Sequence, residues 1–205
     1  MVFFGITGKG KTHGIADFLD YVRAAALVEL VLVHDVKEST PQFAGTVIHE
    51  ADDAFTVEGA ATVYPATFVL RRRGLDHRPS VERLARRTLE AGYGDVTTMA
   101  VLDEWGQAAS DAPSIEQLFS EGRGLHASAI VGKQLPQGLP NWARAQSSLV
   151  IFGLNGAGAE FLADPPLKSY DKATADVVRR LEERQFIVVP QEGDPDGVVY
   201  EVPLR

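Results

Sequence analysis

The chain opens with an alternation of apolar runs and helical patterns. Val2–Phe4 is a short apolar run that leads into glycines, which predicts a buried strand feeding a turn. Apolar residues then recur at helical spacing from Ile15 to Val22 and predict a helix over residues 11–26. Residues 27–33 are valine and leucine broken only by Glu29, which is typical of a strand covered on both faces.

The same alternation continues along the rest of the chain. Further strands are predicted over residues 46–48, 61–70, 97–102, 127–132 and 149–154, and a helix over residues 79–91, with Pro79 at its start and Gly92 at its end. Ser114 is a predicted N-cap, with Gln117 three residues on, for a helix that runs to about Glu121. Strands that alternate with helices predict an α/β fold with a mainly parallel central sheet flanked by helices.

The C-terminal part follows a different pattern. Residues 168–184 predict an exposed amphipathic helix. Residues 186–189 and 198–202 flank the glycine- and proline-containing segment 193–197, which indicates a β-hairpin. We therefore expect a C-terminal helix and hairpin appended to the α/β core.

Composition limits the possible classes of protein. With 205 residues, of which 45% are hydrophobic, we expect residues 1–205 to form a single domain. The absence of cysteine excludes disulfides and cysteine-based zinc sites. No apolar stretch approaches the ~18 residues of a membrane span, and the N-terminus lacks the basic start of a signal peptide, so we expect a soluble protein.

The chain is acidic overall but has one basic segment. Its net charge of -8 argues against a protein that simply coats nucleic acid. Residues 68–87, however, hold seven arginines against two acids, a local charge of 7 - 2 = +5. This arginine cluster has two interpretations: a grip on a phosphate backbone, or a solvated helix face with ion pairs between subunits.

Residues 5–12 read GITGKGKT and match G-x-x-x-x-G-K-[ST] at every fixed position. Glycines let such a loop curl so that its N–H groups point at phosphate oxygens, and the following helix adds its positive N-terminal dipole. Lys11 is expected to reach the β- and γ-phosphates, and the Thr12 hydroxyl to ligate Mg²⁺. The predicted ATP-binding residues are Gly5, Thr7, Gly8, Lys9, Gly10, Lys11, Thr12 and His13.

Two later strand ends carry polar side chains. The apolar run that starts at Met99 ends in Asp103 and Glu104. Asp103 is the expected second Mg²⁺ ligand, and Glu104 the expected general base for the attacking water. Gln134 follows the strand over residues 127–132 and is either a group between the γ-phosphate and that water or an ordinary surface glutamine.

Together these motifs resemble the FtsK/HerA-type P-loop ATPases, which are ring-forming DNA translocases. Four stretches carry the resemblance: residues 5–12, residues 31–37, residues 101–104, and a run from Gly122 and Arg123 through Gln134 to Arg144 and Gln146. The resemblance implies a RecA-like core, Glu104 as the catalytic residue and Gln134 as a sensor. It also implies that Arg123, or as second choice Arg144, acts as an arginine finger in the neighbouring subunit's ATP site. Lys133 departs from the small hydroxyl residue found there in many relatives.

Within this superfamily the chain looks most like the genome-packaging ATPases of viruses with an internal membrane. That resemblance implies double-stranded DNA as a partner, a ring of five or six copies, and contact with capsid vertex or membrane proteins of a virion. It also implies a location in the host cytoplasm and in virions.

Two alternatives stay open at this point. One is a P-loop ATPase that drives protein secretion or phage assembly, with the C-terminal helix and hairpin as docking surfaces. The other is a nucleoside or small-molecule kinase, against which Asp103 and Glu104 argue because they suit the activation of water.

Overall fold

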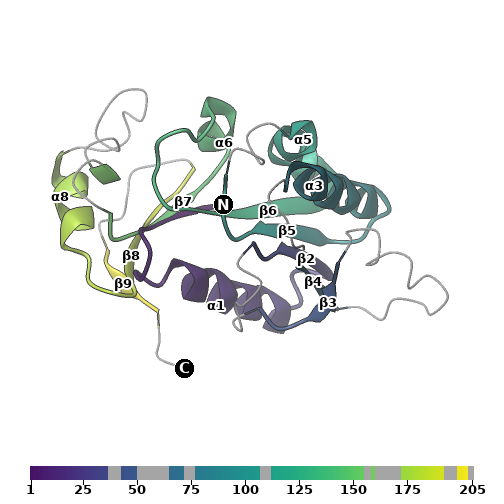
Figure 1. The fold of residues 1–205 in the computed structure, drawn as a ribbon, viewed down its shortest axis with the longest axis horizontal. Helices are drawn as coiled ribbons and strands as arrows, with labels where there is room; N and C mark the ends of the chain where they lie inside the picture. The colour runs from purple at the N-terminus through teal and green to yellow at the C-terminus, as the bar shows by residue number, and fades with distance from the viewer. Residues whose placement is uncertain are drawn as a thin grey trace. The chain divides into compact units, whose positions relative to one another are not determined.

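The structure, a computed structural model, describes residues 1–36, 43–49, 65–71, 77–106, 112–154, 158–159, 172–191 and 198–202 (Figure 1). The chain forms two compact units: the first holds Met1–Asp17 and Gly132–Arg205, the second Phe18–Val131. The boundary falls inside helix α1 (Lys11–Ala24) and strand β6 (Ala127–Lys133), so both elements contribute to both units.

The second unit is built on parallel strands. Their order is β3 (Thr46–Ile48), β4 (Ala66–Leu70), β2 (Leu30–His34), β5 (Thr98–Leu102) and β6. Each neighbouring pair is parallel, and Leu30 stands beside Ala66 on one side and Thr98 on the other. All residues of β2 and β5 are buried, as expected for apolar strands covered on both faces.

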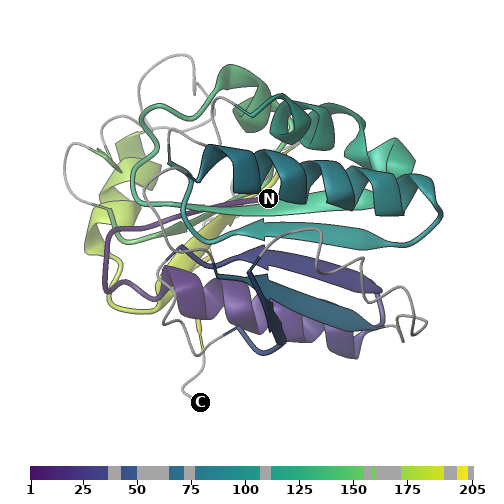
Figure 2. The same cartoon turned by 45° about the vertical axis from the view of Figure 1, so that its right-hand side comes forward.

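Helices cover both faces of these strands. Helix α3 (Arg78–Tyr93) packs against β2, β5 and helix α5 (Pro113–Glu121), which continues into the short 3-10 helix η1 (Gly122–Leu125). The buried residues of α3 recur at helical spacing from Val81 to Leu89 and face this contact. Figure 2 shows α3 and α5 on one side of the strands and α1 on the other.

The first unit holds strands β1 (Val2–Phe4), β7 (Leu149–Phe152), β8 (Gln185–Val189) and β9 (Tyr200–Glu201), in the order β1-β7-β8-β9. β1 and β7 are parallel, whereas β7–β8 and β8–β9 are antiparallel. Stacked or tilted rings connect Phe3, Phe152, Phe186 and Tyr200, with centroids 5.2 to 6.5 Å apart. The first unit also contains helices α6 (Asn141–Ala145) and α8 (Lys172–Arg180).

The predicted fold class is confirmed: a mixed sheet of mostly parallel strands is flanked by helices, with a C-terminal helix and an antiparallel β8–β9 pair. Several boundaries were wrong. Helix α3 ends at Tyr93 and Gly94 follows it, while α8 ends at Arg180. Strand β2 begins at Leu30 because the Leu27 amide still bonds back to the carbonyl of Val22. Residues 61–64, 168–171 and 193–197, which carried parts of the predictions, lie outside the described residues.

The predicted N-cap of α5 was also wrong. Ala112 occupies the cap position, and Pro113 is the first helical residue. Ser114 lies inside the helix, where both its amide, at 3.0 Å, and its hydroxyl donate to the carboxylate of Glu82 on α3. A carboxylate from a neighbouring helix therefore accepts a backbone N–H at the N-terminus of α5. A local capping pattern cannot predict this contact, because Glu82 is distant in sequence.

Candidate functional site

The glycine-rich loop connects β1 to α1. The Gly5 amide donates to the Lys133 carbonyl at the end of β6 (3.1 Å), and the Ile6 amide donates to the carbonyl of Gly153 (3.3 Å). Gly8 and Gly10 have φ angles of 84° and 91°, a left-handed conformation in which other residues are strained. The loop therefore has a fixed, curled backbone at the N-terminus of α1, the geometry that binds anions.

Close packing explains two more glycines of this segment. A Cβ atom on Gly5 would lie 2.8 Å from Cβ of Phe152, and one on Gly14 would lie 2.5 Å from Cζ of the same ring. Phe152 is fully buried at the end of β7. The phenylalanine thus lies against both the start of the loop and the first turns of α1.

The side chains of the loop differ in exposure. Thr7 and Gly8 at its tip are exposed, whereas Lys11, the first residue of α1, is buried. Thr12 is partly buried, and His13 is exposed. An exposed loop tip and a lysine at the first position of the following helix are the arrangement expected for this motif.

The end of β6 lies beside the start of the loop. The Lys133 carbonyl accepts the Gly5 amide, and partial burial lowers the pKa of the Lys133 ammonium. Gln134 follows immediately and is exposed. Gln134 therefore directly follows the residue whose carbonyl bonds to Gly5, although the two segments are far apart in sequence.

Asp103 and Glu104 lie just beyond β5 in the second unit. Asp103 is completely buried, and its amide donates to the carbonyl of His34 at the end of β2 (3.4 Å). Glu104 is partly exposed. A buried carboxylate followed by an accessible one suits the two predicted roles, metal ligand and general base.

A second carboxylate, to which the sequence analysis gave no role, follows the neighbouring strand. Asp35 follows β2, is buried, and forms an ion pair with Arg71, which follows β4 (Nε–Oδ2 3.2 Å). Asp35 and Asp103 thus end adjacent parallel strands. The signal was present in the sequence as an acid directly after an apolar run, the same signal that identified Asp103.

His34 lies next to this pair. Its ring makes an edge-to-face contact with His77 at 5.3 Å, and His77 is the N-cap residue of α3. Burial, followed by the nearby His77 charge, lowers the pKa of His34 to about 4, although Asp35 acts in the opposite direction. His34 is therefore neutral at physiological pH.

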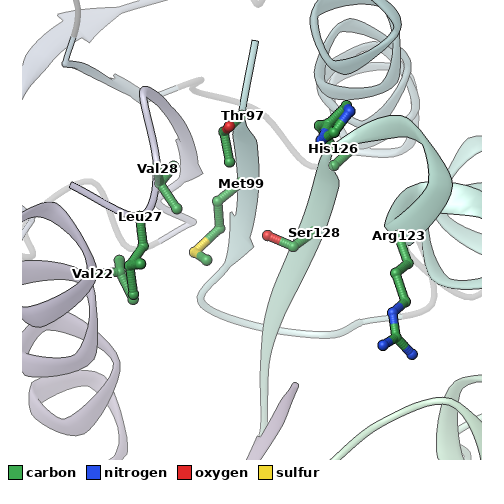
Figure 3. Close-up of a pocket in the computed structure, with 9 residues that line it drawn as sticks. Val22, Leu27, Val28, Thr97, Met99, Arg123, His126 and Ser128 are labelled. Atoms are coloured by element: carbon green, nitrogen blue, oxygen red, sulfur yellow. The ribbon is translucent and has the colours of Figure 1, made fainter. Parts of the chain in front are cut away.

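The first-choice arginine finger lies on the surface of the second unit. Arg123 belongs to η1 and is exposed. It lines a pocket of about 320 Å³ together with residues of α1, β5 and β6 (Figure 3). Figure 3 shows Arg123 at the side of this pocket opposite Val22 and Leu27. An exposed guanidinium of this kind can reach another copy of the chain.

The second-choice finger is engaged within its own helix. Arg144 lies in α6, where its guanidinium donates to the side chain of Asn141. Arg144 is thus engaged within α6, whereas Arg123 is exposed on η1.

The arginine cluster is partly paired. Arg86 and Arg87 form ion pairs with Glu82 (3.5 Å) and Glu90 (2.8 Å) of the same helix. Arg78 and Arg83 are exposed on α3, while Arg72 and Arg73 lie outside the described residues. Surface pairs of this kind contribute little to stability, so these side chains can exchange partners.

The predicted residues therefore fall into two sets. The first unit holds the glycine-rich loop, Gln134 and Arg144, and the second holds Asp103, Glu104 and Arg123.

No helix among the described residues is long and apolar enough to cross a bilayer.

Comparison with known proteins adds to this geometry. No protein-family model matches the chain, and no curated protein matches it in sequence. Its fold is similar to that of the genome-packaging NTPase of Sulfolobus turreted icosahedral virus 2 in complex with AMPPCP, with a TM-score of 0.70 and 15% identity over 99% of this chain and 96% of that one. The DNA-packaging ATPase of Sulfolobus turreted icosahedral virus gives a TM-score of 0.68 at 14% identity, over 100% and 97% of the two chains.

A bacterial conjugative coupling protein, TrwB, is also similar, with a TM-score of 0.66 and 11% identity over 100% of this chain and 84% of that one. These three likenesses show the fold, which this chain shares with the two packaging enzymes and the coupling protein.

Proposed function

We propose that this chain is an ATP-hydrolysing motor that translocates double-stranded DNA and packages a viral genome. The observation that carries the proposal is the curled Gly5–Thr12 backbone, which joins a buried strand to a helix N-terminus and has Lys11 buried at its base. The nearly complete overlap with a packaging NTPase that binds AMPPCP supports the same conclusion.

Each site residue has a role in this proposal. The loop amides and Lys11 bind the phosphates, Glu104 takes a proton from the attacking water, and Gln134 orients that water beside the γ-phosphate. Charge that builds on the γ-phosphoryl oxygens is stabilised by Arg123 of the next copy in a ring. The site is thus completed by assembly into a closed ring of five or six copies.

The metal of this proposal is Mg²⁺. Thr12 in the first turn of α1 and the buried Asp103 both offer oxygen atoms, which Mg²⁺ prefers, and Mg²⁺ usually keeps water and phosphate as its remaining ligands. Across the described ranges no group of three or more histidine and acidic side chains could hold a metal ion unaided. Mg²⁺ would therefore arrive with the nucleotide and neutralise its charge.

The arginine cluster is the proposed DNA contact. Arg78 and Arg83 are exposed, and the pairs of Arg86 and Arg87 are weak surface pairs. Several such cations give a grip on phosphates that depends on salt and not on base sequence. Capsid vertex or membrane proteins of a virion are the remaining proposed partners.

DNA-stimulated ATP hydrolysis tests the proposal. Wild-type protein is assayed with and without double-stranded DNA across a salt series, with Lys11→Ala as the inactive control. We expect stimulation at low salt that declines steeply as salt rises, and neither basal nor stimulated activity in the Lys11→Ala variant. No stimulation at low salt would contradict DNA as the track. Stimulation by an unfolded polypeptide would instead support the alternative of a protein-secretion or phage-assembly motor.

A further inference from the structure

Lys9 of the glycine-rich loop is held at two points by a distant segment. Its ammonium donates to the carbonyl of Leu181 (Nζ–O 3.1 Å), and its own carbonyl accepts the amide of Arg184 (3.1 Å). Leu181 and Arg184 bound the four-residue turn between α8 and β8, which we call the α8–β8 turn. The loop is thus tied to a segment 172 residues away in sequence.

Two glycines allow this close approach. A Cβ atom on Gly10 would lie 3.1 Å from Cα of Arg184. One on Gly153 would lie 2.9 Å from Cε of Lys9 and 3.1 Å from the Leu181 carbonyl oxygen. Any side chain at these positions would separate the loop from the turn, or would have to displace the Lys9 stem.

The turn itself is firmly placed. The Val202 amide donates to the Arg184 carbonyl (3.0 Å), and the side chain of Gln185 accepts the Glu182 amide (3.0 Å). Arg184 has a φ angle of 70°, a conformation that is costly for a non-glycine residue and persists only where surrounding contacts fix it. The α8–β8 turn is therefore a fixed support and not a loose connection.

The electrostatics of the contact are favourable as well. Leu181 directly follows the last residue of α8, so its carbonyl lies at the negative C-terminal end of that helix. An ammonium placed there donates to a carbonyl that has no partner within the helix, and it also interacts favourably with the helix dipole. This direction of the Lys9 side chain leaves Lys11 as the loop lysine for phosphate.

We infer that Lys9 is a positioning residue of the ATP site, which fixes the phosphate-binding loop on the α8–β8 turn through its ammonium. The inference rests on the proposed ATPase function. A loop that contains three glycines loses much conformational freedom when it closes around a phosphate. Anchoring Lys9 fixes the curled backbone before the nucleotide arrives, and such preorganisation strengthens binding to every nucleotide that uses the loop.

Nucleotide affinities of matched variants test this inference. Lys9→Met keeps the apolar stem and removes the ammonium, Lys9→Arg restores a cationic donor, and Arg179→Met removes an exposed cation from α8 as the control. The readouts are the dissociation constants of MgATP and MgADP, and kcat. We expect Lys9→Met to weaken MgATP and MgADP equally, by about tenfold, with kcat changed less than about threefold. Lys9→Arg should recover most of the affinity, and Arg179→Met should match wild type.

Other outcomes overturn the inference. A loss of kcat beyond about a hundredfold, or a loss confined to MgATP, would mean that Lys9 contacts the γ-phosphate directly. Unchanged affinities in Lys9→Met would mean that the tie is irrelevant to binding. Gly153→Ala disturbs the same junction without altering Lys9 chemistry and should reproduce the loss of affinity. If wild-type protein itself binds no MgATP, the proposed function fails, which is a distinguishable result.

Discussion

The ring of Phe152 lies directly against the backbone of Gly14: a Cβ atom at that position would be 2.5 Å from Cζ of the ring. Phe152 ends β7, whereas Gly14 lies in the first turns of α1, two residues after the end of the glycine-rich motif. The packing of one aromatic side chain therefore sets how closely the first turns of α1 approach β7. The start of the loop at Gly5 lies against the Cβ atom of the same residue.

Gly14→Ala should destabilise the protein by about 1–2 kcal/mol. Overpacking a filled core costs about 1–3 kcal/mol, and the better helix propensity of alanine offsets up to about 1 kcal/mol of this. Urea unfolding measures the change. The double variant with Phe152→Leu should recover part of the loss, because a smaller side chain makes room for the methyl group. Gly124→Ala, where a Cβ atom meets nothing within 4 Å, is the control and should not destabilise.

Local patterns predicted the backbone of the glycine-rich loop well. The motif at residues 5–12 combines a glycine turn, a helix start and a lysine, and all three are determined by neighbours in sequence. The acids after β5 were found for a similar reason, since a buried parallel strand must end in polar residues where it leaves the core.

Contacts between distant segments could not be predicted in this way. The bond from Lys9 to Leu181 joins residues 172 positions apart, and nothing in the local pattern around either residue indicates it. The same holds for Glu82, whose carboxylate from α3 replaced the expected Ser114 cap of α5. In both cases tertiary packing supplied a partner that local propensity assigned elsewhere.

Glu104→Gln should stop turnover and leave ATP binding intact. Glutamine keeps the size of the side chain and its partly exposed position after β5, but it cannot accept a proton from water. We expect kcat to fall by about 10²–10⁴-fold, with the dissociation constant of MgATP nearly unchanged. Asp103→Asn is the comparison, because loss of a predicted metal ligand should weaken Mg²⁺-dependent binding itself. Normal hydrolysis by Glu104→Gln would show that another group is the base.

Arg123→Ala should abolish hydrolysis while each subunit still binds nucleotide. A trans arginine contributes about 10³–10⁵ in kcat, and Arg123 is exposed on η1, where it can reach another copy. The decisive measurement mixes two inactive variants, Arg123→Ala and Lys11→Ala. Some interfaces then combine an intact finger with an intact loop, so activity should return in part. The comparison is a mixture of Arg144→Ala with Lys11→Ala. If activity returns in this mixture and not in the one with Arg123→Ala, the finger is Arg144.

His34 should make the stability of the protein depend on pH. Burial first, and the charge of His77 second, lower the pKa of His34 in the folded protein to about 4, from 6.5 in the unfolded chain, although Asp35 partly opposes them. Between these values the unfolded chain binds the extra proton, so the contribution is complete above pH 6.5 and is lost as the pH falls towards 4. At pH 5 the loss is on the order of 2 kcal/mol relative to pH 7. Urea unfolding at both pH values measures the free energy of unfolding. The difference between pH 7 and pH 5 should be smaller by about that amount in His34→Gln than in wild type. The control is His126→Asn, at an exposed position, which should retain the wild-type difference. Equal pH dependence in wild type and His34→Gln would mean that the folded protein admits a proton at His34, and that Asp35 outweighs burial at the end of β2.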